Sequence, residues 1–434
     1  MLEKNKNRLL RVIALARQEG AWRALVAVWR RLRHGRPMRG AAIDVFQHFD
    51  FVWSKPIAAL PGVAAKNTLA WFIPDFNIGS GGHMNIFRMI WYLERMGFES
   101  TIYIVTPTQH HNAAEARRII RRHFSPVEAQ VRVGLKRVAP CEFAVATGWD
   151  TAYAVRAFEG ARHKIYYVQD FEPWFFPMGS EYVLAENTYR FGFFGITAGH
   201  WLAEKLARAY GMQTHAVGFG VDQERFKRLP RREPHIRRVF FYARPPTPRR
   251  AFELGLLALG EVAKRLPQTH FIFAGWDTTA YHIAFSHHSA GTISVDELPD
   301  LFSQCDVALV LSLTNISLLP LELMACGCCV VSNRGDNVQW LLDADVAALA
   351  DATPEALADA ITALLTDAPR RAQLSARGEA FARARHWGSA AQAFVDGLER
   401  VRAAPGANAQ AHVSTQDDAG DDAAGQQRAA SAAI

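Results

Sequence analysis

The sequence has no run of about 18 uninterrupted apolar residues, the length that a helix needs to cross a bilayer, so we predict no membrane-spanning helix. Cysteine is scarce, with five in 434 residues. Three of them, Cys326, Cys328 and Cys329, follow a spacing that forms neither a disulfide framework nor a paired C-x-x-C zinc motif. We therefore predict that the cysteines are small buried residues in a reducing cytosol.

An excess of positive charge is found only in the first forty residues. The formal net charge is +7, and residues 1–40 contain 11 Lys and Arg against 2 acidic residues, which is +9. The rest of the chain therefore carries 7 − 9 = −2. Because nucleic-acid binding needs a basic face on the folded domain, we expect no nucleic-acid partner.

The N-terminal residues do not have the pattern of a signal peptide, because Arg11, Arg17 and Glu19 interrupt their apolar stretch. Residues 8–33 predict one or two amphipathic helices, with two tryptophans and three aliphatic residues on one face and arginines beside it. Two interpretations stay open. The helix lies on an anionic membrane surface, or it packs on its own protein with its arginines solvated. We predict a cytoplasmic protein in both cases, free or peripheral on the cytoplasmic face of the inner membrane.

Strand and helix patterns alternate twice along the chain, which predicts two α/β units with parallel sheets. The first series predicts a strand at 68–73, a helix at 84–96, strands at 98–105, 141–147, 164–169 and 193–198, and a helix at 201–210. The second predicts strands at 239–243, 270–274, 307–311 and 329–332, and helices at 251–265, 319–326, 354–367 and 370–385.

The domain boundaries follow from the break between these two series, a stretch at 222–237 that contains Pro230 and Pro234. The predicted division is a basic helical extension at 1–40, a first Rossmann-like domain at 41–225, a second at 226–385, a helix at 386–400 returning to the first domain, and a tail at 401–434. The tail consists mostly of small and polar residues without an aromatic side chain, which predicts disorder.

A glycine-rich loop follows the first strand and ends in Gly81, Gly82 and His83. Glycines let a backbone approach a ligand closely, and the helix start beside them favours an anion. His83 is a candidate donor to a sugar hydroxyl or a phosphate. The alternative is a tight turn followed by an ordinary helix residue.

Polar residues also follow the predicted strand at 164–169, where Gln169, Asp170 and Glu172 stand at or just beyond its end. That edge of an open α/β sheet faces the ligand crevice, so these carboxylates are candidates for orienting or deprotonating an acceptor hydroxyl. Trp174 is a candidate for stacking on a sugar ring. The alternative is a loop that is anchored by aromatic packing.

Three arginines follow the first strand of the second series, at Arg244, Arg249 and Arg250. Arginine presents fixed, bidentate geometry to phosphate oxygens, so this group predicts a diphosphate clamp. A solvated surface loop is the alternative.

The segment before the helix at 319–326 completes the candidate site. Pro320 suits the first turn of a helix, and the backbone N–H groups of Ser317, Leu318 and Leu319 are candidates for holding a diphosphate. Glu322 is a candidate acceptor for a ribose hydroxyl.

These motifs together resemble a known family. Residues 320–327 (Pro-Leu-Glu-Leu-Met-Ala-Cys-Gly), with the glycine loop and the arginines, are similar to the donor site of glycosyltransferase family 4. Residues 73–88, 168–173 and 241–245 resemble, more narrowly, the WsaF-type rhamnosyltransferases, and the likeness extends over about 68–400.

The resemblance implies a GT-B fold, with two Rossmann-like parallel-sheet domains facing across a cleft. It implies a retaining transferase that moves L-rhamnose from dTDP-L-rhamnose to a rhamnose-containing bacterial surface glycan such as an O-antigen. The first domain would bind the acceptor, free or lipid-linked, and the second the nucleotide sugar. Neither a metal nor a cofactor is expected, because the dTDP-sugar is a substrate and GT-B enzymes neutralise the departing diphosphate with basic side chains and a helix N-terminus.

The resemblance also implies roles for the candidate residues. The glycine loop would approach the diphosphate, the arginines would clamp it, and Glu322 would hold the ribose. Gln169 and Asp170 would lie near the reacting carbon, with Asp170 on the acceptor side. One position departs from the family pattern, because Thr314 stands where most of family 4 has a first glutamate.

Two other functions are kept as alternatives. A sugar-nucleotide epimerase on the same fold would need no acceptor site. A catalytically inactive scaffold in a glycan-assembly complex would explain the absence of a glutamate at Thr314 and the basic N-terminus.

Overall fold

The computed structural model describes residues 48–403. The predicted extension at 1–40, with its amphipathic helix at 8–33, and residues 404–434 of the predicted tail lie outside this range. The chain divides into a unit of Met1–Ser54, whose described part contains the short helix η1 (Asp50–Trp53), and a unit of Lys55–Ile434 that contains both sheets. None of the helices described between residues 48 and 403 is long and apolar enough to cross a membrane.

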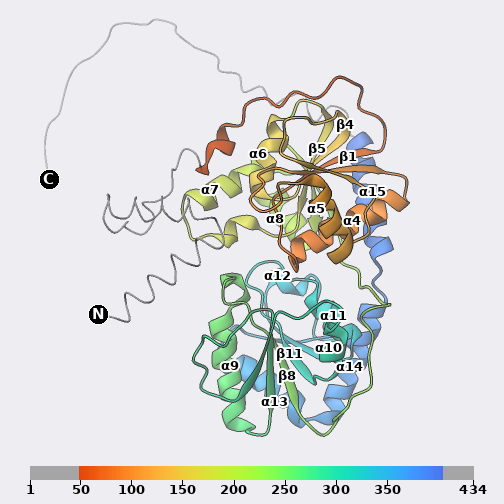
Figure 1. Cartoon of the computed structure of the whole chain (residues 1–434). Coiled ribbons are helices and arrows are strands. Elements are labelled where there is room, and N and C mark those ends of the chain that lie inside the picture. The colour runs from red at the N-terminus through yellow and green to blue at the C-terminus, as the bar shows by residue number, and fades with distance from the viewer. Residues whose placement is uncertain (1–47, 404–434) are drawn as a thin grey trace, which may run out of the picture. The chain divides into compact units, whose positions relative to one another are not determined.

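The first lobe contains a parallel sheet of seven strands in the order β3-β2-β1-β4-β5-β6-β7 (Figure 1). The strands are β1 Thr68–Ile73, β2 Glu99–Ile104, β3 Gln130–Val133, β4 Cys141–Ala146, β5 Ala161–Val168, β6 Phe194–Ala198 and β7 Thr214–Val217. Its helical segments are α4 Gly81–Arg95, α5 Ala113–His123, α6 Trp149–Ala157, η2 Glu172–Phe175, α7 Ser180–Asn187, η3 Thr188–Arg190 and α8 His200–Tyr210. Because neighbouring strands are parallel, their carboxyl ends share one edge, where ligands bind in open α/β sheets.

The second lobe contains a parallel sheet of six strands in the order β10-β9-β8-β11-β12-β13. The strands are β8 Arg238–Tyr242, β9 His270–Ala274, β10 His287–Gly291, β11 Val307–Leu309, β12 Cys329–Asn333 and β13 Ala348–Ala350. The helical segments are η4 Pro248–Arg250, α9 Phe252–Arg265, α10 Leu298–Ser303, α11 Leu319–Ala325, α12 Asp336–Gln339, α13 Pro354–Thr366 and α14 Ala368–Arg383, and α15 Trp387–Ala403 follows.

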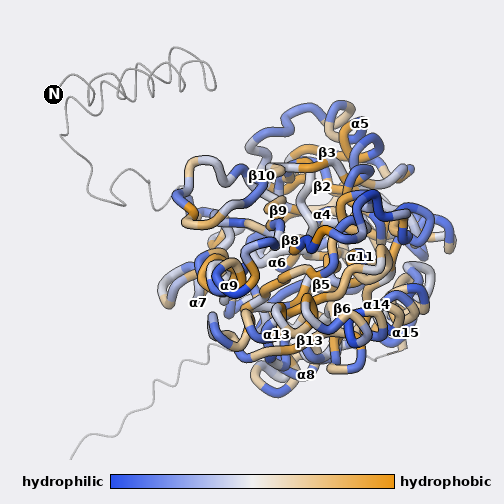
Figure 2. Tube along the Cα trace, turned by 90° about the horizontal axis from the view of Figure 1, so that it is seen from below, coloured by the Kyte–Doolittle hydropathy of each residue, from blue (hydrophilic) through white to orange (hydrophobic). Residues whose placement is uncertain are grey.

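The sheets form the core of each lobe, with helices packed over them. All six residues of β4 and all five of β12 are buried. Figure 2 shows mixed colouring in surface helices such as α9, where hydrophobic and hydrophilic residues alternate along the turns. Continuous burial is typical of parallel strands covered on both faces, and it confirms the predicted α/β class.

The five cysteines are unbridged and buried, which confirms the prediction that they pack as small apolar residues. Burial raises the pKa of the Cys305 thiol to about 12. These thiols therefore stay protonated at neutral pH, and their contribution is to packing.

Helix α4 begins three residues earlier than predicted, at Gly81. Ser80 has extended backbone angles and stands as the N-cap, so Gly81, Gly82 and His83 form the first helical turn. The sequence predicted a loop here because glycine is a weak helix former. This turn is nevertheless held, because the Met84 amide donates to Ser80 O at 2.9 Å.

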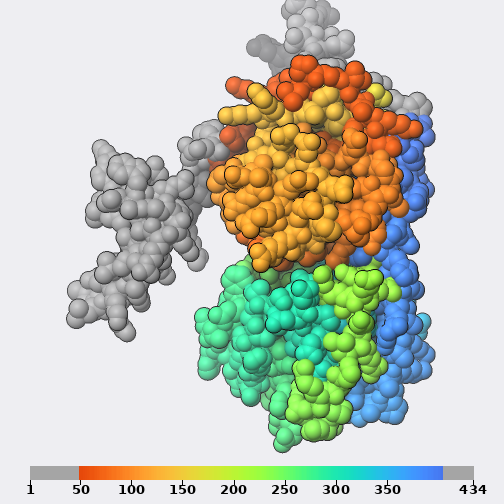
Figure 3. Space-filling view, turned by 45° about the vertical axis from the view of Figure 1, so that its right-hand side comes forward, coloured from red at the N-terminus to blue at the C-terminus, as the bar shows by residue number. Residues whose placement is uncertain are grey.

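Helix α15 returns to the first lobe and lies beside α4 (Figure 1). Figure 3 shows this C-terminal segment, in blue, lying against both lobes. The Phe394 ring packs against Trp71 and Tyr167, with ring centroids 5.7 and 5.4 Å apart. The helix continues through Ala403, so the predicted start of the tail at 401 is wrong. It continues because Val401 is buried and Arg402 is held by first-lobe partners.

Arg402 anchors the end of α15. Its guanidinium donates to both oxygens of Glu142, at 2.7 and 2.6 Å, and to Asn67 Oδ1 at 2.6 Å. Its side chain is 17% exposed and that of Glu142 is 6% exposed. The pair is therefore largely out of solvent, where charge-assisted hydrogen bonds are strong.

Arg402→Ala is expected to lower the free energy of unfolding by about 2–4 kcal/mol, because Glu142 would remain buried without its cation. Urea denaturation at pH 7 measures this. Arg400→Ala, at an exposed position of the same helix, is the control and should stay within about 0.5 kcal/mol of the wild type. Equal losses in the two variants would contradict the anchoring role.

Candidate functional site

The carboxyl edges of the two sheets meet through two short segments. Gln169 and Asp170 follow β5, and Thr314 and Asn315 lie between β11 and α11. The Thr314 hydroxyl donates to Asp170 Oδ2 at 2.7 Å, and the Asn315 amide donates to Oδ1 at 2.8 Å. The Asn315 side chain donates to Gln169 O at 2.9 Å. The residues predicted to lie near the reacting carbon thus sit where the lobes touch.

Asn315 is the most fully bonded residue of this contact, and the sequence analysis did not single it out. Its Nδ2 also donates to Ala198 O at 2.8 Å, and its Oδ1 accepts from Trp340 Nε1 at 2.7 Å. A Cβ atom on Gly199 would lie only 2.5 Å from the Trp340 ring, so the glycine leaves room for this ring. The sequence signal for Asn315 was an asparagine between Thr314 and Ile316. Both neighbours are buried, and a buried amide side chain requires hydrogen-bond partners.

Two of the predicted arginines face this contact from η4. Arg250 Nη1 donates to Ser312 Oγ at 2.7 Å. Arg249 Nε lies 3.9 Å from Asp170 Oδ2, and its guanidinium stacks over the Phe175 ring at 4.0 Å. Arg244 acts electrostatically on both, while its Nη1 donates to Gly275 O at 3.3 Å. The structure therefore brings the three arginines into one positively charged region.

Asp170 is held more tightly than a free base would be. Besides the bonds from the second lobe, its Oδ1 accepts from the Phe171 amide at 2.8 Å. Burial raises the pKa of Asp170, against the lowering effect of these bonds and of the two arginines. Its Oδ1 accepts from two backbone amides and its Oδ2 from the Thr314 hydroxyl, so the carboxylate joins the two lobes, and its acceptor-side role stays a prediction.

His83 is also engaged within the protein. Its Nδ1 lies 2.9 Å from Ser80 Oγ and its Nε2 lies 3.2 Å from Pro74 O. Burial lowers the His83 pKa to about 4, so the imidazole is neutral at pH 7. Its predicted role as a donor to a ligand is not supported here, because the nitrogen beside Pro74 O must carry the proton and the other accepts from Ser80.

Gly82 and Gln169 are neighbours, as their common predicted location requires. Gln169 Nε2 donates to Gly82 O at 3.2 Å, and Asn85 Nδ2 donates to Gln169 Oε1 at 3.2 Å. Gly81 is exposed and has open space around its Cβ position. The first turn of α4 thus lies directly beside the contact between the lobes.

Glu172 is buried, which corrects its predicted role in binding an acceptor. Its Oε2 accepts from the Trp149 amide at 2.7 Å and its Oε1 from the Tyr166 hydroxyl at 2.8 Å. Trp174, by contrast, is 39% exposed, packs on Phe171 and has Lys205 Nζ 4.6 Å from its ring centroid. Of the two residues predicted to bind the acceptor glycan, only Trp174 is exposed to solvent.

The buried Glu172 gives a testable pH dependence. Burial raises its pKa to about 8 in the folded protein, above the ordinary 4.5, so the stability that it contributes is full below pH 4.5 and is lost as pH rises toward 8. Glu172→Gln mimics the protonated carboxyl and should be the more stable protein at pH 8, by about 1–3 kcal/mol. Unfolding measured from pH 5 to 9 tests this, with exposed Glu159→Gln as the control. Parallel profiles for wild type and Glu172→Gln would disprove it.

Helix α11 begins at Leu319, as predicted, with Leu318 as its N-cap and Pro320 in its first turn. Burial raises the pKa of Glu322 to about 7, while Arg88 of α4 acts to lower it. The Ser317 hydroxyl is buried without a hydrogen-bond partner among residues 48–403. Arg88 is a second residue that the sequence analysis missed as a site residue.

Buried polar atoms without partners gather around this region. Among residues 48–403 they include Asn85 Oδ1 and Arg88 Nη1 on α4, Arg249 Nε on η4 and Ser317 Oγ before α11. Leaving such an atom unpaired costs about 1–3 kcal/mol, so native structures rarely do so without a reason. A polar ligand between these segments would supply the missing partners.

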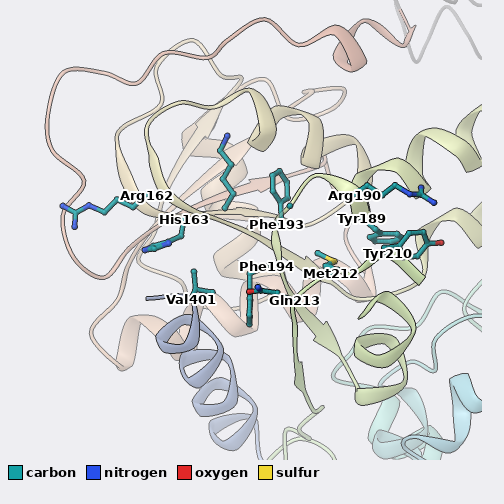
Figure 4. A pocket seen from close by; sticks show the side chains of 13 residues that line it. Arg162, His163, Tyr189, Arg190, Phe193, Phe194, Tyr210, Met212, Gln213 and Val401 are labelled. Carbon is teal, nitrogen blue, oxygen red and sulfur yellow. The ribbon is translucent and has the colours of Figure 1, made fainter. Parts of the chain in front are cut away.

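A separate pocket of about 380 Å³ lies at the opposite edge of the first sheet (Figure 4). Its walls include Arg162 and Lys164 at the start of β5, Phe194 at the start of β6 and Val401 of α15. These positions lie at the amino ends of the strands, away from Asp170. This pocket is therefore not the candidate site. Among the described residues, no group of three or more His, Cys, Asp or Glu side chains forms a metal site.

Comparison with known sequences finds a matching family model and a relative of this chain. Residues 237–362 match the family model described as WsaF, C-terminal domain. The chain is 34% identical over 298 residues to the O-antigen biosynthesis protein RfbC of Myxococcus xanthus. That match covers 66% of this chain and 23% of the relative, so the chain spans about a quarter of the relative's length.

Solved structures with the same architecture include a sucrose-phosphate synthase and a protein bound to UDP-glucose. Sucrose-phosphate synthase from Thermosynechococcus elongatus matches 78% of this chain and 100% of its own, with a TM-score of 0.61 and 13% identity. Anabaena HepE in complex with UDP-glucose matches 78% of this chain and 100% of its own, with a TM-score of 0.60 and 17% identity. At these identities the likeness shows the fold alone, and it confirms the predicted GT-B arrangement of two parallel-sheet lobes.

Proposed function

We propose that this chain, which has the GT-B fold and matches the WsaF C-terminal domain over residues 237–362, is a retaining glycosyltransferase of surface-glycan biosynthesis. The proposed donor is dTDP-L-rhamnose, and the proposed acceptor is a rhamnose-containing glycan, free or lipid-linked. The similarity to an O-antigen biosynthesis protein supports the glycan, and UDP-glucose bound to HepE supports a nucleotide sugar. The resemblance of the motifs to rhamnosyltransferases supports the sugar.

The observation that carries the proposal is the guanidinium of Arg249. Its Nε is buried without a hydrogen-bond partner in the described part of the chain, beside the charge of Arg250. Two neighbouring cations, one with an unused donor, fit the diphosphate of a nucleotide sugar. In the reaction, the bond from the anomeric carbon to the diphosphate breaks and a bond to the acceptor oxygen forms. The acceptor proton leaves with the nucleoside diphosphate, whose growing negative charge the guanidinium groups stabilise.

The remaining residues are assigned around that clamp. Glu322 accepts from a ribose hydroxyl, and the exposed face of Trp174 stacks on an acceptor sugar. Thr314 and Asp170 lie beside the donor sugar, with no cofactor involved beyond the nucleotide that the substrate itself carries.

Peripheral contact of residues 8–33 with an anionic membrane is a further part of the proposal. Flotation with anionic liposomes should recover the full chain and lose a chain that begins at residue 41.

The decisive assay incubates the purified chain with dTDP-L-rhamnose, with and without an oligorhamnose acceptor, and follows free dTDP and the extended glycan. UDP-glucose and dTDP-glucose are the matched donor controls. We expect dTDP release that depends on the acceptor and on the rhamnose donor. Conversion of the donor without an acceptor would instead identify an epimerase, and transfer from UDP-glucose alone would overturn the choice of sugar.

An inactive scaffold is the second candidate, and one observation favours it: both carboxylate oxygens of Asp170 accept hydrogen bonds from protein groups. A cell that carries Arg249→Ala separates the two functions. An unchanged surface glycan in that cell, together with an altered one when the whole protein is deleted, would establish the scaffold.

A further inference from the structure

The side chain of Asn315, in the second lobe, binds two strand ends of the first lobe. It is buried, and its Nδ2 donates to Gln169 O at 2.9 Å and to Ala198 O at 2.8 Å. Ala198 ends β6, and Gln169 follows the last residue of β5, the strand that pairs with β6. An amide nitrogen has two donors, so both are used on the carboxyl edge of the first sheet.

Trp340 fixes the orientation of that amide. It follows α12 in the second lobe, and its Nε1 donates to Asn315 Oδ1 at 2.7 Å. An indole N–H can only donate, so it selects the orientation in which the amide oxygen faces Trp340 and the NH₂ group faces the first lobe. These hydrogen bonds therefore form one chain from the end of α12 to the ends of β5 and β6.

The Trp340 ring also fits a notch in the first lobe. A Cβ atom on Gly199 would lie 2.5 Å from the ring, closer than packed atoms approach. The centroid of the ring lies 6.1 Å from that of His200, the first residue of α8, and 5.5 Å from that of Phe219. Helices α12 and α8 lie beside each other across the two lobes (Figure 1). The lobes thus meet through a polar contact at Asn315 and a steric fit at Gly199.

We infer that Asn315 and Trp340 are positioning residues for sugar transfer, which hold the two lobes in the register that the reaction needs. This inference rests on the proposed function. Asn315 follows Thr314 directly, so its contacts also place the Thr314 hydroxyl and the Asn315 amide on the two oxygens of Asp170, at 2.7 and 2.8 Å. A shift of the lobes would separate Asp170 from Arg249, whose Nε lies 3.9 Å from Oδ2. Misplacing reacting groups by about 1 Å can cost about 100-fold in rate.

A steric wedge tests the notch without removing any polar group. Gly199→Ala places a methyl group against the Trp340 ring, so kcat is expected to fall by roughly 30- to 100-fold. The KM for the donor should change little, because the arginines and α11 of the second lobe are untouched. Gly211→Ala is the control. Both glycines have a positive φ, +90° and +64°, but the Cβ position of Gly211 has no atom within 4 Å, so this variant should keep the wild-type rate.

Two further variants test the hydrogen bonds. Asn315→Asp keeps the acceptor for Trp340 but turns a carboxylate oxygen toward the carbonyls of Gln169 and Ala198. Trp340→Phe keeps a ring at Gly199 and removes the N–H. Each should lower kcat by about tenfold or more, because buried polar atoms lose their partners. Calorimetric counting of dTDP-binding sites per chain gives the folded fraction. A loss that disappears when kcat is expressed per binding site would overturn the inference.

Small-angle X-ray scattering of the full chain needs no substrate. We expect a larger radius of gyration for Gly199→Ala and Asn315→Asp than for the wild type and Gly211→Ala. Wild-type scattering together with a wild-type kcat in Gly199→Ala would overturn the inference, as would equal losses in the two glycine variants. A wild type that transfers no sugar, but whose lobes separate in Gly199→Ala, would refute the proposed function and leave the control of the lobes by these residues established.

Discussion

Arg249→Ala is expected to lower the rate of sugar transfer by about two to three orders of magnitude, the usual loss when one preorganised donor to a developing negative charge is removed. Arg249 is the strongest candidate because its buried Nε has no partner within residues 48–403 and its neighbour is another cation. A diphosphate in the site would supply both the missing hydrogen bond and the opposite charge.

Stability should change little in the same variant. The substitution removes the stacking of Arg249 on Phe175 and its attraction to Asp170, but also the repulsion from Arg250, so we expect a net change within about 1 kcal/mol. Arg249→Lys, which keeps the charge without the planar donor, should show an intermediate rate. The control is Arg232→Ala, at an exposed arginine paired with Asp300. Activity above a tenth of the wild type in Arg249→Ala would remove this residue from the clamp.

Asp170 is expected to give the second large effect, and two variants separate its possible roles. Asp170→Ala leaves three donors without an acceptor, those of Thr314, Asn315 and Phe171. With about 1–3 kcal/mol for each unsatisfied buried group, a loss of about 3–5 kcal/mol in the free energy of unfolding is expected, with most of the activity. Chemical denaturation and the transfer assay measure the two losses.

Asp170→Asn keeps the hydrogen bonds and removes the charge. Its amide oxygen can accept from the two backbone amides, while its NH₂ donates to the Thr314 hydroxyl, which can rotate to accept. The folded protein should therefore retain nearly its full stability. If the charge of Asp170 balances the arginines during the reaction, the rate falls by about two orders of magnitude. A fully active Asp170→Asn protein would restrict Asp170 to joining the lobes.

Much of the fold was predictable because its strands are buried on both faces. The apolar runs at β1, β4 and β8 are long enough to identify from composition alone. The four short edge strands β3, β7, β10 and β13 were missed, since strands at an edge are half exposed and their patterns resemble loops. The glycine pair at the start of α4 was predicted as a loop because glycine has a low helix propensity. Tertiary contacts nevertheless hold these residues in the helix.

The candidate site was predictable in its segments and less so in its contacts. Residues at the carboxyl ends of parallel strands must share an edge, which is why Asp170, Arg249 and Arg250 come together as expected. Whether a polar side chain of the site already has its hydrogen-bond partners depends on residues of the other lobe. The hydrogen bond from Thr314 to Asp170 joins residues 144 positions apart. No local pattern reveals such pairs.

The return of α15 has a consequence for how this protein is made in the cell. The first lobe needs Phe394 against Trp71 and Arg402 against Glu142 to complete its surface. Those residues leave the ribosome only after the whole second lobe has been synthesised. The first lobe therefore waits, with part of its apolar surface uncovered, through the translation of more than 150 further residues. During that interval chaperone binding would protect it, and a ribosome stalled after residue 225 would release a fragment prone to aggregation.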